Sequence, residues 1–297
     1  MAASRKFSTA AELLERLAEW NMDLPDFVVA RDAADSGLSG EEIRAEVAHR
    51  IGVTRHALER GIGEPQKSFS GMTDGAACRF LNAASLPVGD EFFRLAVGYS
   101  LAVNEVNACG GRIVAFPTAG SCGIIPGVLW AWRDAREPSL GPESKRFQDA
   151  FITAAAVGIL VATGSSIAGA TGGCQAECGA AAAMAAAGLA SLQGTGAAGV
   201  FNAAALSLKN SLGLACDPVA GLVEVPCVKR NGFMAANALV AASMQAAGIT
   251  SVIPFDEVVS AMKSIGDAMP SSLKESSEGG LALTPTGLSY RNRISGA

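Results

Sequence analysis

The sequence predicts an all-α fold, and three observations support this prediction. Apolar residues recur every three or four positions along most of the chain, which is the period of a helix with one buried face. Runs of alternating β-branched residues, the pattern of a strand, are nearly absent. The chain has 297 residues, 49% of them hydrophobic, and so can bury a sizeable core.

The first part of the chain, residues 1–63, predicts a small element of short, charged, amphipathic helices. Thr9 with Glu12 and Ser39 with Glu42 fit the spacing of a capping box, in which side chains satisfy the free backbone donors of a helix start. Residues 64–297 would form the main helical domain.

The next segments alternate loops with apolar helices. A loop over Glu64–Ala77 is followed by a long helix from Glu91 that stops at the Gly110-Gly111 pair. After a turn rich in Gly, Ser and Thr, a further helix is expected from Val128. The polar stretch Arg133–Phe147 predicts an exposed connection.

The C-terminal half begins with almost continuous helix from Phe151 to Lys209, interrupted near Gly172 and Gly194. Its first part, Phe151–Ala170, is uncharged and long enough to span a membrane. Because its residues are mostly small, a helix buried in a protein core fits better. A later helix closes at Pro270, and a loop through the sequence TPTG is expected after it.

Net charge and the absence of targeting signals limit the expected binding partners and the expected location. The net charge is −5 and no block of Lys or Arg occurs, which argues against a nucleic acid or an anionic membrane as partner. The N-terminus lacks the long apolar run of a secretory signal. A cytoplasmic location is therefore expected, where the seven cysteines would be reduced and more often bind metal or catalyse than form disulfides.

Polar loops between the apolar helices are the candidate sites. Their glycines let the backbone approach a ligand closely, and their Ser and Thr hydroxyls suit a carboxylate ligand. Ordinary helix-connecting turns are the alternative. The four loops are SGMTDG (Ser70–Gly75), PTAGSCG (Pro117–Gly123), GGCQAECG (Gly172–Gly179) and CDPVAGLVEVPCVKRN (Cys216–Asn231).

The cysteines divide by their surroundings. Cys78 and Cys109 lie in helical, apolar sequence and read as buried hydrophobic residues, whereas Cys122 is ambiguous. Cysteines in loops with Gly or Pro can turn inward, and these are Cys174, Cys216 and Cys227. Cys178 follows Cys174 by one helical turn and is either a ligand or the start of a packed helix.

The spacing of the cysteines and histidines indicates which kind of metal centre they could hold. No close-set Cys pair of a structural zinc site occurs, and both histidines, His49 and His56, lie in the N-terminal element. Cysteines in such number fit an iron–sulfur cluster better, and a missing fourth ligand would leave one iron open as a Lewis acid. Lys209 and Lys229 could each form a Schiff base with pyridoxal phosphate, but no phosphate-binding loop accompanies either lysine.

Long motifs in the chain resemble one known family. The segments AVNEVNACGGRIVAFPTAGSCGIIPGVL, GGCQAECG, NSLGLACDPVAGLVEVPCVKRN and EGGLALTPTG are similar, in order and spacing, to the α subunit of the iron–sulfur-dependent L-serine dehydratases. The resemblance covers nearly the whole chain. It implies that residues 64–297 form an all-helical catalytic domain whose 4Fe-4S cluster is held by Cys174, Cys216 and Cys227.

The same resemblance implies a reaction, a pathway and partners. L-serine would lose water by α,β-elimination and yield pyruvate and ammonia, with the open cluster iron acting as a Lewis acid on the β-hydroxyl, in serine degradation and gluconeogenesis. Single-chain relatives carry a C-terminal cysteine, whereas this chain ends YRNRISGA. A separate β subunit with a Ser-Ser-His-Thr motif is therefore expected, in an oligomer.

The resemblance also suggests roles for individual residues. The groups expected to handle protons or charge are Glu105, Glu177 and Lys229. The groups expected to hold the substrate are Ser70, Gly71, Thr118, Ala119, Gly120, Ser121 and Arg230.

Three positions depart from the family pattern and keep alternatives open. Asp74 stands where a second Gly is usual, Cys109 where Ser or Ala is common, and Phe116 replaces a small residue. One alternative is a biosynthetic relative that dehydrates, or eliminates from, another β-substituted amino acid. The other is a non-catalytic subunit whose cluster senses iron or oxygen.

Overall fold

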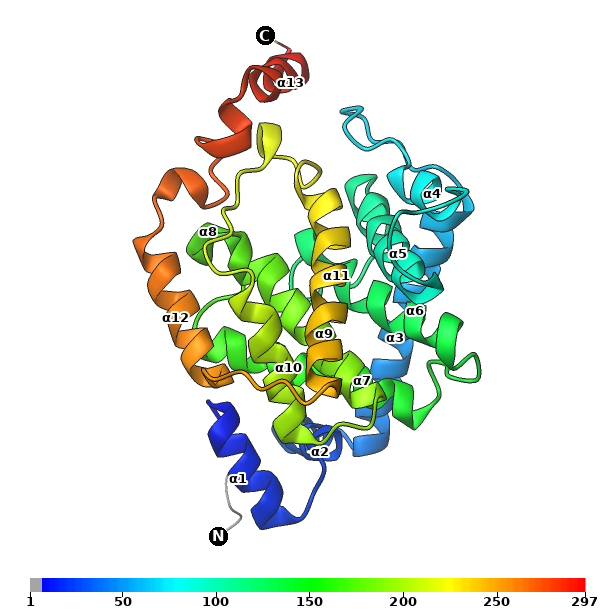
Figure 1. Cartoon of the computed structure of the whole chain (residues 1–297), viewed down its shortest axis with the longest axis vertical. Helices are drawn as coiled ribbons and strands as arrows, with labels where there is room; N and C mark the ends of the chain where they lie inside the picture. The colour runs from blue at the N-terminus through cyan, green and yellow to red at the C-terminus, as the bar shows by residue number, and fades with distance from the viewer. Residues whose placement is uncertain (1–6, 297) are drawn as a thin grey trace.

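The fold is helical, as predicted. The structure, a computed structural model, describes residues 7–296, and no β-strand occurs among them beyond two isolated bridges. Figure 1 shows α11 running upright near the centre of the view, with α9, which packs against it, beside it. The α-helices are α1 (Ala10–Trp20), α2 (Leu24–Ser36), α3 (Gly40–Gly63), α4 (Ala76–Leu81), α5 (Glu91–Ala108), α6 (Ile124–Arg136), α7 (Lys145–Gly164), α8 (Gly169–Gly172), α9 (Ala180–Leu192), α10 (Ala197–Lys209), α11 (Cys227–Ala246), α12 (Phe255–Ala268) and α13 (Pro285–Ser295).

The core is built around α9, which packs against α6, α7, α10 and α11. Nearly every residue of α9 is buried, and most of them are alanines. At Gly188 a Cβ atom would lie 2.9 Å from the carbonyl oxygen of Ala150 on α7. Because glycine lacks that atom, the two helices approach closely.

Helix α7 contains most of the segment whose composition raised the question of a membrane span. It is the one helix within residues 7–296 that is long and apolar enough to cross a membrane. In the fold, 67% of its most apolar 18-residue window is buried, and it packs against α2, α3 and α9. These contacts support the interpretation as a core helix.

The N-terminal element consists of α1, α2 and α3. The capping box at Ser39 is confirmed, with Glu42 N–H donating to Ser39 Oγ and Ser39 N–H to the Glu42 carboxylate. Thr9 caps α1, but the Glu12 carboxylate accepts from Ser8 and leaves that box half formed. Helix α3, at 24 residues, is longer than the short helices predicted.

The boundary at residue 63 coincides with the end of α3. Buried side chains on both sides of it, including Phe27 and Leu58 before and Leu129 and Phe147 after, belong to one hydrophobic cluster. The division into two domains stays a prediction.

Four predicted boundaries were wrong. Helix α6 begins at Ile124, with Pro126 in its first turn, where a missing N–H is tolerated. The long helix expected from Phe151 also breaks over residues 165–168. The GGCQAECG stretch is a π-helix, η2 (Gln175–Gly179), preceded by α8. The TPTG stretch starts α13, which Thr284 caps.

Candidate functional site

Three buried cysteines from separate elements mark the candidate site. Cys174 directly precedes η2, Cys216 lies in the loop before α11, and Cys227 is the first residue of α11 rather than part of the loop. Their exposed fractions are 1%, 3% and 7%, respectively. Segments far apart in the chain thus bring thiols into one region of the core.

Cys216 is held by the chain that follows α12. Its N–H donates to the carbonyl of Leu273 at 2.8 Å, and Glu275 N–H donates to its carbonyl at 2.7 Å. The Cys216 thiol donates to Glu177 Oε2 at 3.5 Å. Ligand atoms of Glu177, Cys216 and Glu275 lie within 4.8 Å of one another.

Glu177 is the buried carboxylate of this site. Burial raises its pKa, while hydrogen bonds from Thr118 and Cys216 partly oppose that shift. Gly169 lies against the Glu177 carboxylate. A Cβ atom at this position would lie 2.5 Å from Glu177 Oε2 and 3.1 Å from Cys216 Sγ. The site therefore has room for the carboxylate and the thiol only because residue 169 has no side chain.

Arg230 provides the positive charge beside the thiols. Its guanidinium donates to the Ala215 carbonyl at 2.6 Å and to Asp217 Oδ1 at 3.0 Å. A hydrogen bond from Cys178 and the charge of Arg230 lower the pKa of Cys174. For Cys178, the sequence allows either a metal ligand or a packing residue. In the structure its thiol donates a hydrogen bond to Cys174.

The remaining thiols are held neutral by their surroundings. Burial raises the pKa of Cys227 to about 12, and negative charge at Cys174 and Glu177 adds to the shift. Burial followed by the Glu177 charge raises the pKa of Cys216 further still. Such thiols lose their protons only when a positive centre binds beside them.

The PTAGSCG loop is held by two buried amides that the sequence analysis missed. Gly120 C=O accepts from Asn104 Nδ2 at 3.0 Å and from Asn231 Nδ2 at 2.8 Å, and Asn231 Oδ1 accepts from Gly123 N–H at 2.9 Å. Ser121 Oγ donates to the Phe116 carbonyl at 2.9 Å. In the sequence, Asn104 and Asn231 could have been recognised as polar residues inside otherwise apolar helices.

The SGMTDG loop is held by a second buried carboxylate, Glu224, which was also missed. Glu224 accepts from the hydroxyls of Ser68, Ser70 and Thr73 at 2.6, 2.8 and 2.8 Å. The available signal was a single carboxylate in the apolar stretch GLVEVP.

Of the other groups predicted to handle protons or charge, one is engaged elsewhere and one is exposed. Glu105 accepts from the N–H groups of Ala76 and Ala77 at 2.6 and 3.3 Å, so it caps α4. Lys229 is exposed. Asp74, one of the departures from the family pattern, is also exposed and pairs with Arg79 at 2.7 Å.

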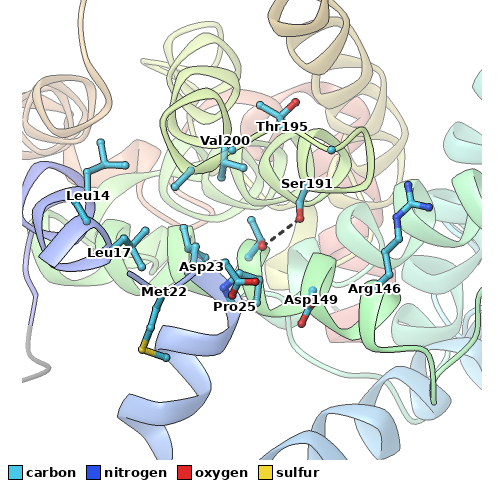
Figure 2. A pocket seen from close by; sticks show the side chains of 16 residues that line it. Leu14, Leu17, Met22, Asp23, Pro25, Arg146, Asp149, Ser191, Thr195 and Val200 are labelled. Carbon is cyan, nitrogen blue, oxygen red and sulfur yellow. Dashed lines mark hydrogen bonds between the residues drawn. The ribbon is translucent and has the colours of Figure 1, made fainter. Parts of the chain in front are cut away.

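Cavities elsewhere in the fold do not include the thiols. Figure 2 shows one of about 500 Å³, lined by residues of α1 and α2 on one side and of α7 and α9 on the other. It contains none of the predicted site residues. Another, of about 520 Å³, is lined by Gly71, Lys229 and residues of α13.

An all-helical fold around buried thiols and carboxylates defines a candidate metal-dependent enzyme. Residues 8–282 match the family model described as serine dehydratase alpha chain. The chain therefore belongs to the serine dehydratase alpha chain family, as the sequence motifs indicated.

Relatives named L-serine dehydratase are similar to most of this chain. A probable L-serine dehydratase alpha chain of Bacillus subtilis (strain 168) is 42% identical over 98% of this chain and 96% of its own. The L-serine dehydratase alpha chain of Peptoniphilus asaccharolyticus is 37% identical over 96% and 97%, respectively. L-serine dehydratase 2 of Escherichia coli (strain K12) is 37% identical over 93% of this chain but only 61% of its own. Membership in this family supports a lyase that deaminates serine.

Proposed function

We propose that this chain deaminates L-serine to pyruvate and ammonia with a 4Fe-4S cluster held by Cys174, Cys216 and Cys227. The observation that carries the proposal is the group of three buried cysteines around Glu177. Negative charge at Cys174 raises the pKa of both other thiols, as expected of groups that share one site.

The arrangement of the thiols argues against a single ion held by all three. A tetrahedral ion with metal–sulfur distances of about 2.3 Å would hold its sulfurs within about 4 Å of one another. Within residues 7–296, the group of potential ligand atoms that lie within 4.8 Å of one another is Glu177, Cys216 and Glu275, not the three cysteines. In a multi-iron centre each cysteine binds a different iron, so that limit does not apply.

When bound, the cluster would supply a Lewis-acidic iron for the β-hydroxyl of the substrate. Arg230 would offset the negative charge of the thiolates, since it already acts on Cys174. Gly120 and Thr118 lie next to the Glu177 carboxylate, so the PTAGSCG loop would hold the substrate against that side of the site.

Glu177 is the strongest of the three proposed proton-handling residues. A base works best when its pKa lies near the working pH, and burial moves the pKa of this carboxyl in that direction. Glu105 is committed to capping α4. We therefore assign to Glu177 the movement of a proton at its Oε atoms, and to Lys229 a role at the outer edge of the site.

A partner and a location complete the proposal. Relatives of equal length are named alpha chains, which supports a separate β chain, and the Escherichia coli relative is longer than this chain. We propose that the β chain brings the Ser-Ser-His-Thr motif to the site, that the complex is an oligomer, and that it is cytoplasmic.

The test is an anaerobic activity assay. The chain, purified without oxygen and with or without its β chain, is given L-serine, L-threonine or L-cysteine, and pyruvate or 2-oxobutanoate is measured beside iron and sulfide content. We expect iron, sulfide and pyruvate from L-serine. Turnover of another amino acid in preference to L-serine would favour the biosynthetic alternative, and a cluster without any turnover would favour the sensor. Full iron content after Cys216→Ala would contradict the ligand assignment.

A further inference from the structure

Glu224 is a buried carboxylate with no cationic partner. Its side chain is 2% exposed and lies in the loop between Cys216 and Cys227. The ion pairs formed within residues 7–296 include that of nearby Asp217 with Arg230, but none to Glu224. Burying a carboxylate without a positive partner is costly, so this charge needs an explanation.

The hydroxyls around Glu224 satisfy most of its acceptor capacity. Oε2 accepts from Ser68 and Thr73, and Oε1 accepts from Ser70. A carboxylate offers about four lone-pair positions. One position on Oε1 is therefore left for a further donor.

The direction of the Ser70 hydrogen bonds restricts what that donor can be. Ser70 Oγ gives its proton to Glu224, accepts the Met72 N–H at 3.0 Å and lies 3.0 Å from Ser68 Oγ, whose own proton goes to Glu224 Oε2. It has no proton left for a substrate carboxylate, and only its remaining lone pair can meet a ligand. A group that only donates, such as an ammonium, matches both Ser70 Oγ and Glu224 Oε1.

Chain neighbours of this arrangement border a ligand-sized space. The cavity of about 520 Å³ is lined by Gly71 and Val225, the chain neighbours of Ser70 and Glu224. The residue before Glu224, Val223, lies 3.4 Å from the position that a Cβ atom would take at Gly120. Residues 223–224 therefore contact both the SGMTDG loop and the PTAGSCG loop.

We propose that Glu224, with the hydroxyls of Ser68, Ser70 and Thr73, forms the subsite for the α-ammonium group of an amino-acid ligand. The inference rests on the proposed function in so far as the ligand is an amino acid. It revises the expectation for Ser70, which would accept from the substrate amine rather than donate to its carboxylate. The subsite would reject hydroxy acids of the same size, because their hydroxyl brings no positive charge.

The experiment measures binding of a matched pair, L-alanine and L-lactate, which differ only in an ammonium or a hydroxyl on the α-carbon. Titration calorimetry is done anaerobically on the complex with the β chain. In wild-type protein L-alanine should bind more tightly. Glu224→Gln should weaken L-alanine about 10- to 100-fold, the usual loss for a hydrogen bond to a charged group, and change L-lactate by less than about threefold.

Three further variants guard against a misfolded protein. Glu224→Asp keeps the charge and should retain more L-alanine binding than Glu224→Gln, while Ser70→Ala should also weaken L-alanine selectively. Asp134→Asn removes a partly buried carboxylate that accepts from Tyr99 and should leave the preference for L-alanine intact. Equal weakening of both ligands by Glu224→Gln would overturn the inference, as would no change in either.

This design separates the two proposals. If the wild-type complex makes no pyruvate from L-serine but binds L-alanine through Glu224, the proposed function fails and the subsite stands. If it makes pyruvate and Glu224→Gln leaves the preference for L-alanine unchanged, the function stands and the subsite is wrong.

Discussion

The Cys216 thiol and the Glu177 carboxylate form a hydrogen-bonded pair, with Sγ 3.5 Å from Oε2. After burial, the Glu177 charge is the next cause of the raised pKa of Cys216, whereas the hydrogen bond that the thiol donates lowers the pKa of Glu177. When a metal centre removes the thiol proton, the Glu177 carboxylate loses a donor and becomes free to bind another. Metal binding and proton handling are thereby linked through one pair of side chains.

Adding a methyl group at Gly169 should disrupt this pair. In Gly169→Ala the new Cβ would lie 2.5 Å from Glu177 Oε2 and 3.1 Å from Cys216 Sγ, so both groups must move. We expect loss of most pyruvate formation and reduced iron content after anaerobic purification. Gly52→Ala is the matched control, because its Cβ meets nothing within 4 Å in α3, and it should stabilise the protein by about 0.5–1 kcal/mol. Normal iron content and activity in Gly169→Ala would refute this account.

The raised pKa of Glu177 predicts how the unfolding free energy depends on pH. Burial raises this pKa above the value of 4.5 that an unperturbed carboxyl has, so between the two values the folded state binds more protons than the unfolded state. The unfolding free energy should therefore fall as pH rises through that window. In Glu177→Gln, urea unfolding of the cluster-free chain should show a smaller decline above pH 4.5 than in wild type. An equal decline in both proteins would mean that Glu177 titrates normally.

Asn231 should be needed for stability as well as for the site. It is fully buried and joins Gly120, Gly123 and Cys227 by hydrogen bonds. Asn231→Ala leaves a buried N–H and a carbonyl without this partner, which costs about 1–3 kcal/mol each. Thermal unfolding should show this loss. Asn237→Ala is on the same helix, but Asn237 is half-buried and its hydrogen bonds, to Ser207, Asn210 and the Met234 sulfur, are 3.1 Å or longer. It should cost clearly less, and equal losses would contradict the role of Asn231.

Phe27 tests how the N-terminal element is joined to the rest. It is fully buried and packs against Phe7 and Trp20. Phe27→Ala should lower the unfolding free energy by about 3–5 kcal/mol. The chain should still unfold in a single transition, at a lower temperature. Phe233→Ala, at a side chain 74% exposed, should have little effect. Two separate transitions, with only one shifted, would instead support independent domains divided near residue 63.

The helical class followed from the sequence because periodicity reports which face of each segment is buried. Segment boundaries followed less well. The π-helix at Gln175–Gly179 and the start of α6 before Pro126 both depend on packing that residue types alone do not encode. Cys174, Cys216 and Cys227 came from a resemblance, and the structure adds that all are buried near Glu177 and Arg230.

The supporting groups of the site were harder to find. Glu224, Asn104 and Asn231 act across loops distant in the chain, so no local spacing reveals their partners. Glu105 is a carboxylate in an apolar helix, yet its hydrogen bonds go to the start of α4. A buried polar residue in a sequence thus signals a contact, but only the fold shows with which group.

The backbone pairing of Cys216 with Leu273 and Glu275 has a consequence for biosynthesis. All three cysteines are translated before Leu273 and Glu275, the residues that fix the Cys216 backbone, leave the ribosome. We expect a nascent chain that ends before residue 273 to leave Cys216 without these backbone hydrogen bonds. Metal delivery should therefore follow completion of the polypeptide, and premature termination near its end should yield a protein that cannot be matured.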